Sequence, residues 1–195
     1  ARVRQGMAAM LRLGSAWYDV AAQVRAVTEA GLDTRCLILC TDDCYAPTLV
    51  REGHMDRVLR HAIAQGLRPM TALQMCTINA ASHFGLGREL GSIAPGRRAD
   101  VVLTDSLVEF RARTVICRGE VVAEGGEMLV PRPGFAWPAA ARDTVHLARG
   151  AAPEDFRIEA PAGANYARAR VIGVVENQAP TRALEAEVPV VDGAL

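Results

Sequence analysis

Residues 36–43 read Cys36-Leu-Ile-Leu-Cys-Thr41-Asp42-Asp43, a short apolar run that stops at two adjacent carboxylates. Four consecutive residues that are apolar or cysteine are typical of a strand buried on both faces, as in a parallel sheet. Asp42 and Asp43 would then follow the carboxyl end of the strand, which is where α/β barrels place their catalytic groups. An equally ordinary interpretation is that the pair starts a turn or caps the next helix.

The residues before this strand predict a strand, a helix and a second strand in succession. Residues 6–13 are mostly apolar and predict the first strand, after which Ser15 is a candidate helix cap. Apolar residues then recur at helical spacing, and Gly31 is expected to end the helix. The members of that apolar face are Trp17, Val20, Ala21, Val24 and Val27. A helical crossover between two strands indicates a parallel sheet.

The segment after the carboxylates predicts a loop and two helices. Residues 44–52 contain Pro47 and are interpreted as a loop at the mouth of the sheet. Residues 54–65 predict an amphipathic helix, and Pro69 suits the first turn of another helix that runs to about Ala80. In the first of these helices, Met55, Val58, Leu59, Ala62 and Ile63 form the apolar face, and Asp56, Arg57, Arg60, His61 and Gln65 form the polar face.

The pattern changes near residue 85, where turn-rich sequence leads into short strands. Strands are expected at 101–104, 114–118 and 120–123, with Arg118-Gly119 as a tight connection between the last two. Prolines at positions 131, 133 and 138 indicate a linker over 131–140. Beyond that linker, residues 171–175 give the clearest strand.

The composition narrows the class of protein. Hydrophobic residues make up 50% of the chain and charged residues 23%, which is ordinary for a soluble globular protein. The formal net charge is zero, so no electrostatic field favours nucleic acid or an anionic membrane as a partner. An odd number of scattered cysteines predicts buried, reduced thiols in the cytoplasm. The chain has no lysine, which excludes Schiff-base chemistry by these residues.

Several blocks, taken in order, resemble the C-terminal half of an amidohydrolase-superfamily enzyme. The general blocks are Thr77-Ile-Asn79-Ala-Ala and Leu90-Gly-Ser-Ile-Ala-Pro-Gly-Arg-Arg-Ala-Asp100-Val-Val-Leu. Thr41-Asp42-Asp43 and Glu52-Gly-His54-Met-Asp56 narrow the resemblance to the bacterial adenine deaminases. The tail, including Val171-Ile-Gly-Val-Val-Glu-Asn-Gln-Ala-Pro-Thr181, is similar to the additional C-terminal domain of those enzymes.

The resemblance implies an α/β chain in three parts. Residues 1–85 would be the last strands and helices of a metal-dependent (β/α)8 barrel. Residues 86–130 would be the return strands of a small β-sandwich domain, and residues 131–195 the linker and the start of the additional domain.

The resemblance also implies the hydrolytic deamination of adenine to hypoxanthine and ammonia by a metal-activated hydroxide, as in purine salvage. The implied cofactor is a pair of divalent metal ions, manganese or iron, with zinc as the alternative, because carboxylate and imidazole ligands suit each of them. Asp42 matches the carboxylate that contacts a metal and transfers the proton. Asp43, Glu52 and His54 are candidates for supporting or lining the pocket. The expected partner is a small purine, and the family often forms homo-oligomers.

The metal-binding histidines of the superfamily have no counterpart in this sequence. No His-x-His occurs among the 195 residues. A single carboxylate cannot hold two metal ions tightly, so the chain is expected to be an incomplete portion of the enzyme and inactive alone. Two alternatives stay open, namely another purine-directed amidohydrolase and a non-catalytic scaffold fragment.

Overall fold

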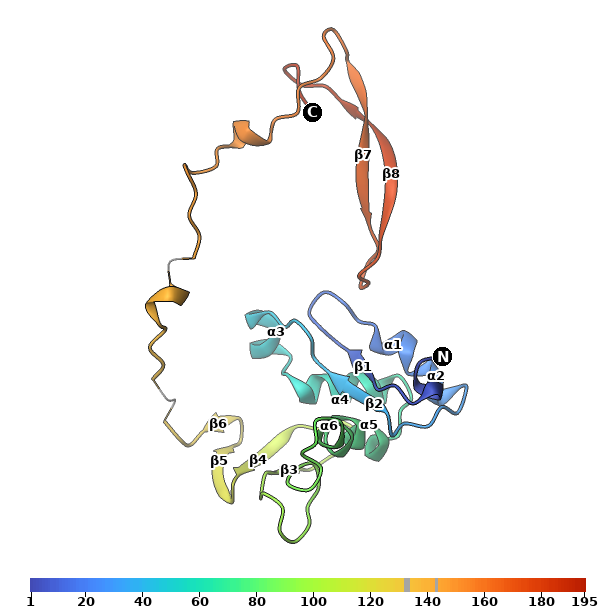
Figure 1. Cartoon of the computed structure of the whole chain (residues 1–195), viewed down its shortest axis with the longest axis vertical. Helices are drawn as coiled ribbons and strands as arrows, with labels where there is room; N and C mark the ends of the chain where they lie inside the picture. Colours follow the sequence, from blue (N-terminus) through green and yellow to red (C-terminus); the bar gives the residue numbers. More distant parts are fainter. Residues whose placement is uncertain (132–133, 143) are drawn as a thin grey trace. The chain divides into compact units, whose positions relative to one another are not determined.

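A computed structural model of the chain describes residues 1–131, 134–142 and 144–195 (Figure 1). The described residues form two compact units. The first comprises Ala1–Pro131 with Glu176–Gln178, and the second comprises the remaining described residues up to Leu195. The elements of the first unit are η1 (Val3–Gln5), β1 (Ala9–Arg12), α1 (Val20–Gln23), α2 (Arg25–Thr28), β2 (Leu37–Cys40), α3 (Ala46–Arg51), α4 (Met55–Ala64), α5 (Pro69–Cys76), α6 (Ile78–His83), β3 (Val101–Thr104), β4 (Ala112–Cys117), β5 (Glu120–Glu124) and β6 (Glu127–Met128). Those of the second are η2 (Ala139–Ala141), η3 (Pro153–Phe156), β7 (Tyr166–Val174) and β8 (Thr181–Pro189).

Strands β1 and β2 are parallel, as the strand–helix–strand pattern predicts. The register pairs Ala9 with Leu37 and continues to Arg12 opposite Cys40, so both strands end at the same edge. The first three residues of β2 are all buried, which confirms the prediction of burial on both faces. The strand expected over residues 6–13 is shorter than predicted and covers only Ala9–Arg12.

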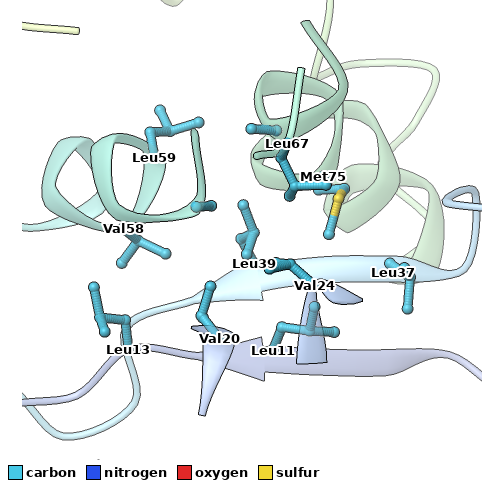
Figure 2. Packing of buried hydrophobic residues seen from close by; sticks show 12 residues of the cluster. Leu11, Leu13, Val20, Val24, Leu37, Leu39, Val58, Leu59, Leu67 and Met75 are labelled. Atoms are coloured by element: carbon cyan, nitrogen blue, oxygen red, sulfur yellow. The ribbon is translucent and has the colours of Figure 1, made fainter. Parts of the chain in front are cut away.

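The hydrophobic core of the first unit lies between these strands and the helices that follow. Figure 1 shows α4, α5 and α6 beside β2, and Figure 2 shows the apolar side chains of strands and helices meeting in one cluster. Full burial of a leucine- or valine-sized side chain contributes about 1.5–3 kcal/mol. The cluster therefore holds the ends of β1 and β2 in place against the helices. Its buried members are Leu11, Leu13, Val20, Val24, Leu37, Leu39, Val58, Leu59, Ala62, Leu67, Ala72 and Met75.

The helix predicted to start after Ser15 begins instead at Val20 and is interrupted at Val24. Ser15 does not cap it, because its hydroxyl has other partners. The backbone N–H of Tyr45 donates to Ser15 Oγ at 2.9 Å, and the same hydroxyl donates to Thr48 Oγ1 at 2.8 Å. Ser15 thus joins the segment after β1 to the segment after β2.

A predicted loop and a predicted helix also differ from the structure. The loop expected over residues 44–52 contains helix α3, because Pro47 lies in its first turn, where no backbone N–H is needed. The helix expected from Pro69 to about Ala80 ends at Cys76, and α6 follows after Thr77. The backbone of Thr77 is not helical, and its hydroxyl donates to the carbonyl of Leu73 at 2.7 Å.

Helix α4 forms where the amphipathic pattern predicts it, but its polar face is not wholly solvated. Arg57, expected in solvent, is buried, and His61 is half-buried. Arg57 donates hydrogen bonds to carbonyls of the segment that leaves β1, and these explain its burial. His61 lies near the Tyr18 ring of the same segment, and its buried Nε2 has no hydrogen-bond partner among the described residues. Periodicity placed Arg57 wrongly because it registers polarity and not the presence of a polar partner.

The strands after residue 100 form an antiparallel sheet in the order β3-β4-β5-β6. The predicted bounds of β3 are confirmed, and β4 and β5 begin or end within two residues of the expected positions. Arg118 and Gly119 connect β4 to β5 with φ values of 52° and 87°, the left-handed geometry of a tight hairpin turn.

The second unit contains the antiparallel hairpin of β7 and β8. The strand expected at 171–175 forms as part of β7, which begins five residues earlier and ends at Val174. Part of the linker expected over 131–140 falls on residues 132 and 133, which lie outside the described residues. The domain boundary expected near residue 85 stays a prediction.

Within the described ranges, no helix has the length and apolar character needed to cross a membrane. The cysteines are unpaired, as expected, but the expectation that they are buried holds only in part. Cys117 is exposed and the other four are intermediate in exposure. Burial raises the pKa of the Cys76 thiol to about 12, so this thiol stays protonated and unreactive at neutral pH.

Candidate active site

Asp42 lies just beyond the carboxyl end of β2, with its side chain partly exposed. Its φ angle is 59°, a left-handed conformation that is uncommon outside glycine but tolerated by aspartate. Nη1 of Arg12, at the end of β1, donates to Asp42 Oδ2 at 2.6 Å. Asp42 therefore follows the strand end with a left-handed backbone conformation, and its side chain is held by the ion pair with Arg12.

Arg12 is itself held by three contacts. Besides the contact with Asp42, its Nε donates to Asp19 Oδ2 at 3.0 Å, and its guanidinium lies 4.5 Å from the ring centroid of Trp17. The hydrogen bonds to Asp42 and then to Asp19 raise the pKa of Arg12 above its ordinary value. The cation is thus permanent.

Asp43 lies against the segment that leaves β1. Its backbone carbonyl accepts a hydrogen bond of 2.9 Å from the backbone N–H of Ser15. Gly14 is so close that a Cβ atom there would lie 2.7 Å from Asp43 Oδ1 and 2.9 Å from the Asp43 carbonyl oxygen. The close approach of the two segments depends on the missing side chain at position 14.

Replacing Gly14 with alanine should destabilise the fold and displace Asp43. The new methyl group would collide with backbone as well as side chain, and such overpacking costs about 1–3 kcal/mol of the free energy of unfolding. Denaturant unfolding of Gly14→Ala measures the change. The matched control is Gly150→Ala, where a Cβ meets nothing within 4 Å. Equal unfolding free energies for the two variants would contradict the prediction.

Glu52 does not contact Asp42 in the described part of the chain but is linked through Arg57 to the segment that leaves β1. Arg57 Nε donates to Glu52 Oε2 at 2.7 Å, and its Nη1 donates to the carbonyls of Leu13 and Gly14, both at 3.1 Å. Arg57 is a functional candidate that the sequence analysis missed. The available signal was an arginine adjoining the apolar positions of an otherwise regular amphipathic helix.

His54 is exposed at the N-terminus of α4. Its backbone N–H donates to Asp56 Oδ1 at 2.8 Å, and within the described residues no hydrogen bond joins its imidazole to Asp42. Gly53, with φ of 105°, allows the Asp56 carboxylate to lie against it. Burial alone would raise the pKa of Asp56, but hydrogen bonds from Arg60 and from the His54 backbone lower it. The block 52–56 thus shapes the turn between α3 and α4.

His61 lies near Tyr18, and the centroids of the two rings are 6.3 Å apart. Its Nε2 is buried and has no hydrogen-bond partner among the described residues. Burial, and then the positive charge of Arg57, lower the pKa of His61 below its ordinary value.

This shift predicts acid sensitivity of the fold. Because the pKa of His61 is lower in the folded state than the unfolded value of about 6.5, the unfolded state binds the proton first as the pH falls. The stabilisation is complete above about pH 6.5 and is lost progressively below it. Unfolding measured at pH 7.5 and pH 5.5 should show a smaller loss of stability in His61→Phe than in the wild type. An equal loss in both proteins would contradict this assignment.

The described residues do not by themselves form a metal centre. No group of three or more His, Cys, Asp or Glu side chains among them is placed to hold an ion. Asp42 is the single sequence-predicted ligand, and its Oδ2 already contacts the Arg12 cation. These residues do not fit a metal pair without further ligands.

The chain belongs to the amidohydrolase family, whose sequence model matches residues 10–122. The match covers most of β1, all of β2, α1 to α6, β3 and β4, and the start of β5. The chain is 63% identical over 193 residues to an adenine deaminase of Roseobacter denitrificans and 64% identical over 193 residues to one of Ruegeria pomeroyi. It is 62% identical over 195 residues to an adenine deaminase of Paracoccus denitrificans. These matches cover 99–100% of this chain and 32% of each relative, so the chain spans about a third of their length.

Proposed function

We propose that this chain is part of an enzyme that hydrolyses adenine to hypoxanthine and ammonia. The observation that carries the proposal is the placement of Asp42. It is a partly exposed carboxylate at the carboxyl end of a buried parallel strand, which is where barrel enzymes hold catalytic groups. The similarity to proteins named adenine deaminase over nearly the whole chain supports the choice of substrate.

We also propose an architecture for the three parts of the chain. Residues 1–85 would be the last strands and helices of a (β/α)8 barrel, with β1 and β2 as neighbouring barrel strands. The parallel pairing with a helical crossover supports this. Residues 86–130 would belong to a small β-sandwich, and 131–195 would form a linker and the start of a further domain.

The proposed reaction needs one group that accepts a proton and then donates it. Water adds to C6 of adenine and the bond from C6 to the exocyclic nitrogen breaks. Asp42 would take one proton from the attacking water and deliver it to the departing amine, which leaves as ammonia, while the second proton of the water ends on N1 of hypoxanthine. Oδ2 of Asp42 is held by Arg12, whereas Oδ1 accepts no hydrogen bond from any described residue. Asp43, Glu52 and His54 are proposed to support or line the pocket.

We also propose that the full-length protein uses a pair of divalent metal ions, with Asp42 as one ligand. Such ions supply Lewis acidity and lower the pKa of water that they bind. The described residues provide one ligand only, so the other ligands would have to come from residues outside this segment. Manganese or iron is proposed, with zinc as the alternative.

The test is the release of ammonia from adenine by a full-length protein that contains residues 1–195, together with its metal content. Hypoxanthine formation in step with ammonia supports the proposal. Turnover of an N6-substituted or oxidised purine with no turnover of adenine would replace it by another purine-directed amidohydrolase. A metal-free protein with no turnover of any aminopurine would indicate a scaffold.

A further inference from the structure

We propose that Arg12 is a positioning residue, which holds the Asp42 carboxylate by Oδ2 and so fixes how its other oxygen, Oδ1, is presented to the reacting groups. This inference rests on the proposed function, because it concerns the group assigned to proton transfer. Arg12 itself touches no reacting atom in the proposal. It acts through Asp42.

The register of the two strands places Arg12 for this role. Arg12 is the last residue of β1 and lies opposite Cys40, the last residue of β2. Asp42 follows two residues later, beyond the hydrogen-bonded part of the sheet. The Arg12 side chain bridges from one strand end to the other, and the 2.6 Å contact between Nη1 and Oδ2 restrains a carboxylate whose own backbone has left the sheet.

Two contacts besides the one with Asp42 hold the Arg12 side chain in place. Nε donates to Asp19 Oδ2, just before α1, and the planar guanidinium lies over the Trp17 ring. These contacts use separate parts of the group, namely one N–H for each carboxylate and the flat face for the indole. A lysine ammonium is a single point charge without that geometry, so it could not reproduce all three contacts.

A surface ion pair that joins no separate elements provides a comparison for the Arg12 pair. Arg35 and Asp33 are two residues apart and form a contact of 2.5 Å, but the Arg35 side chain is 87% exposed and the pair joins no separate elements. Such surface pairs contribute little to stability. The Arg12 pair joins residues thirty positions apart and includes the carboxylate proposed to react. Arg35 therefore serves as the matched control.

The experiment compares Arg12→Gln, Asp19→Asn and Arg35→Gln in the full-length protein. Removal of a residue that orients a reacting ligand typically lowers activity by about 10- to 100-fold. We expect Arg12→Gln to lose kcat by that factor while KM changes little, because only the geometry of the transferring group is altered. Asp19→Asn, which loosens Arg12 without touching Asp42, should lose less of kcat. Arg35→Gln should match the wild type.

Two readouts separate positioning from general stability. Added guanidinium ion should restore part of kcat in Arg12→Gly, because the ion can lie on Trp17 beside Asp42, and it should not restore Arg35→Gly beyond the wild-type response. A crystal structure of Arg12→Gln should show the Asp42 carboxylate displaced. Thermal unfolding of each variant gives the folded fraction against which kcat is corrected.

Specific results would overturn the inference. A higher KM with unchanged kcat in Arg12→Gln would mean that Arg12 binds substrate. A loss of kcat no larger than the loss of folded protein would make Arg12 a structural residue. If the wild-type full-length protein releases no ammonia from adenine, the proposed function fails. The position of Asp42 in the Arg12→Gln crystal structure then still decides whether Arg12 positions it, and an unmoved carboxylate rejects the inference.

Discussion

Asp42→Asn is expected to abolish the release of ammonia from adenine by the full-length protein while leaving the fold intact. Asparagine has the shape of aspartate, tolerates the φ angle of 59°, and can still accept a hydrogen bond from Arg12. It cannot take a proton from water and deliver it to the amine. General acid–base groups contribute about 100- to 10,000-fold, so the loss of kcat should be at least about 100-fold.

The matched control for this substitution is Asp33→Asn. Asp33 is also an aspartate paired with an arginine, and its pKa is lowered mainly by the hydrogen bond from Arg35, but it lies before β2 and not at its carboxyl end. Asp33→Asn should retain wild-type turnover. Circular dichroism and melting of both variants establish that they fold. Near-normal turnover in Asp42→Asn would mean that a different carboxylate transfers the proton.

The elements that apolar patterning alone determines are predicted most accurately from the sequence. The run Leu37–Cys40 and the run Val101–Thr104 form strands with the bounds that were expected. Each is short, apolar and followed by a turn, so local preference and burial agree. The parallel pairing of β1 with β2 follows from the helical crossover between them for the same reason.

The misplaced residues are those whose position depends on a partner far away in the sequence. Arg57 is polar by type, and only the carbonyls of Leu13 and Gly14, more than forty positions earlier, make its burial favourable. Serine often caps helices, but the hydroxyl of Ser15 is already hydrogen-bonded to the backbone N–H of Tyr45 and to Oγ1 of Thr48. Periodicity carries no information about such contacts.

The candidate site divides in the same way. The two carboxylates at the end of β2 could be predicted because their position relative to the strand is local. The link from Glu52 to the segment that follows β1 could not, since it passes through Arg57. The ion pair that fixes Asp42 was equally hidden, because Arg12 lies within a strand that is otherwise mostly apolar.

Arg57→Met should destabilise the first unit by about 2–4 kcal/mol. Arg57 is only 8% exposed, so methionine can fill much of its volume, but the carbonyls of Leu13 and Gly14 would lose their side-chain donor. Leaving a buried acceptor unsatisfied costs about 1–3 kcal/mol. Loss of the contact with Glu52 adds less, because that carboxylate is 53% exposed and water can replace the arginine. Denaturant unfolding followed by circular dichroism gives the change.

Two companion variants identify which contact of Arg57 accounts for the loss. Glu52→Gln removes only the charge partner and should cost well under the full effect, whereas Arg51→Met, at an exposed position of α3, should leave stability close to the wild-type value. If Glu52→Gln destabilised the protein as much as Arg57→Met, the ion pair and not the carbonyl contacts would explain the result.

The charge of Arg57 also makes a prediction that a simple packing role would not. Arg57 is one of the two causes that lower the pKa of His61, after burial. In Arg57→Met that repulsion is removed, so the pKa of His61 should rise toward its unfolded value and less stability should be lost between pH 7.5 and pH 5.5. The variant would thus be less stable than the wild type at neutral pH but would lose less on acidification. Parallel stability–pH curves for the two proteins would show that Arg57 does not act on His61 through its charge.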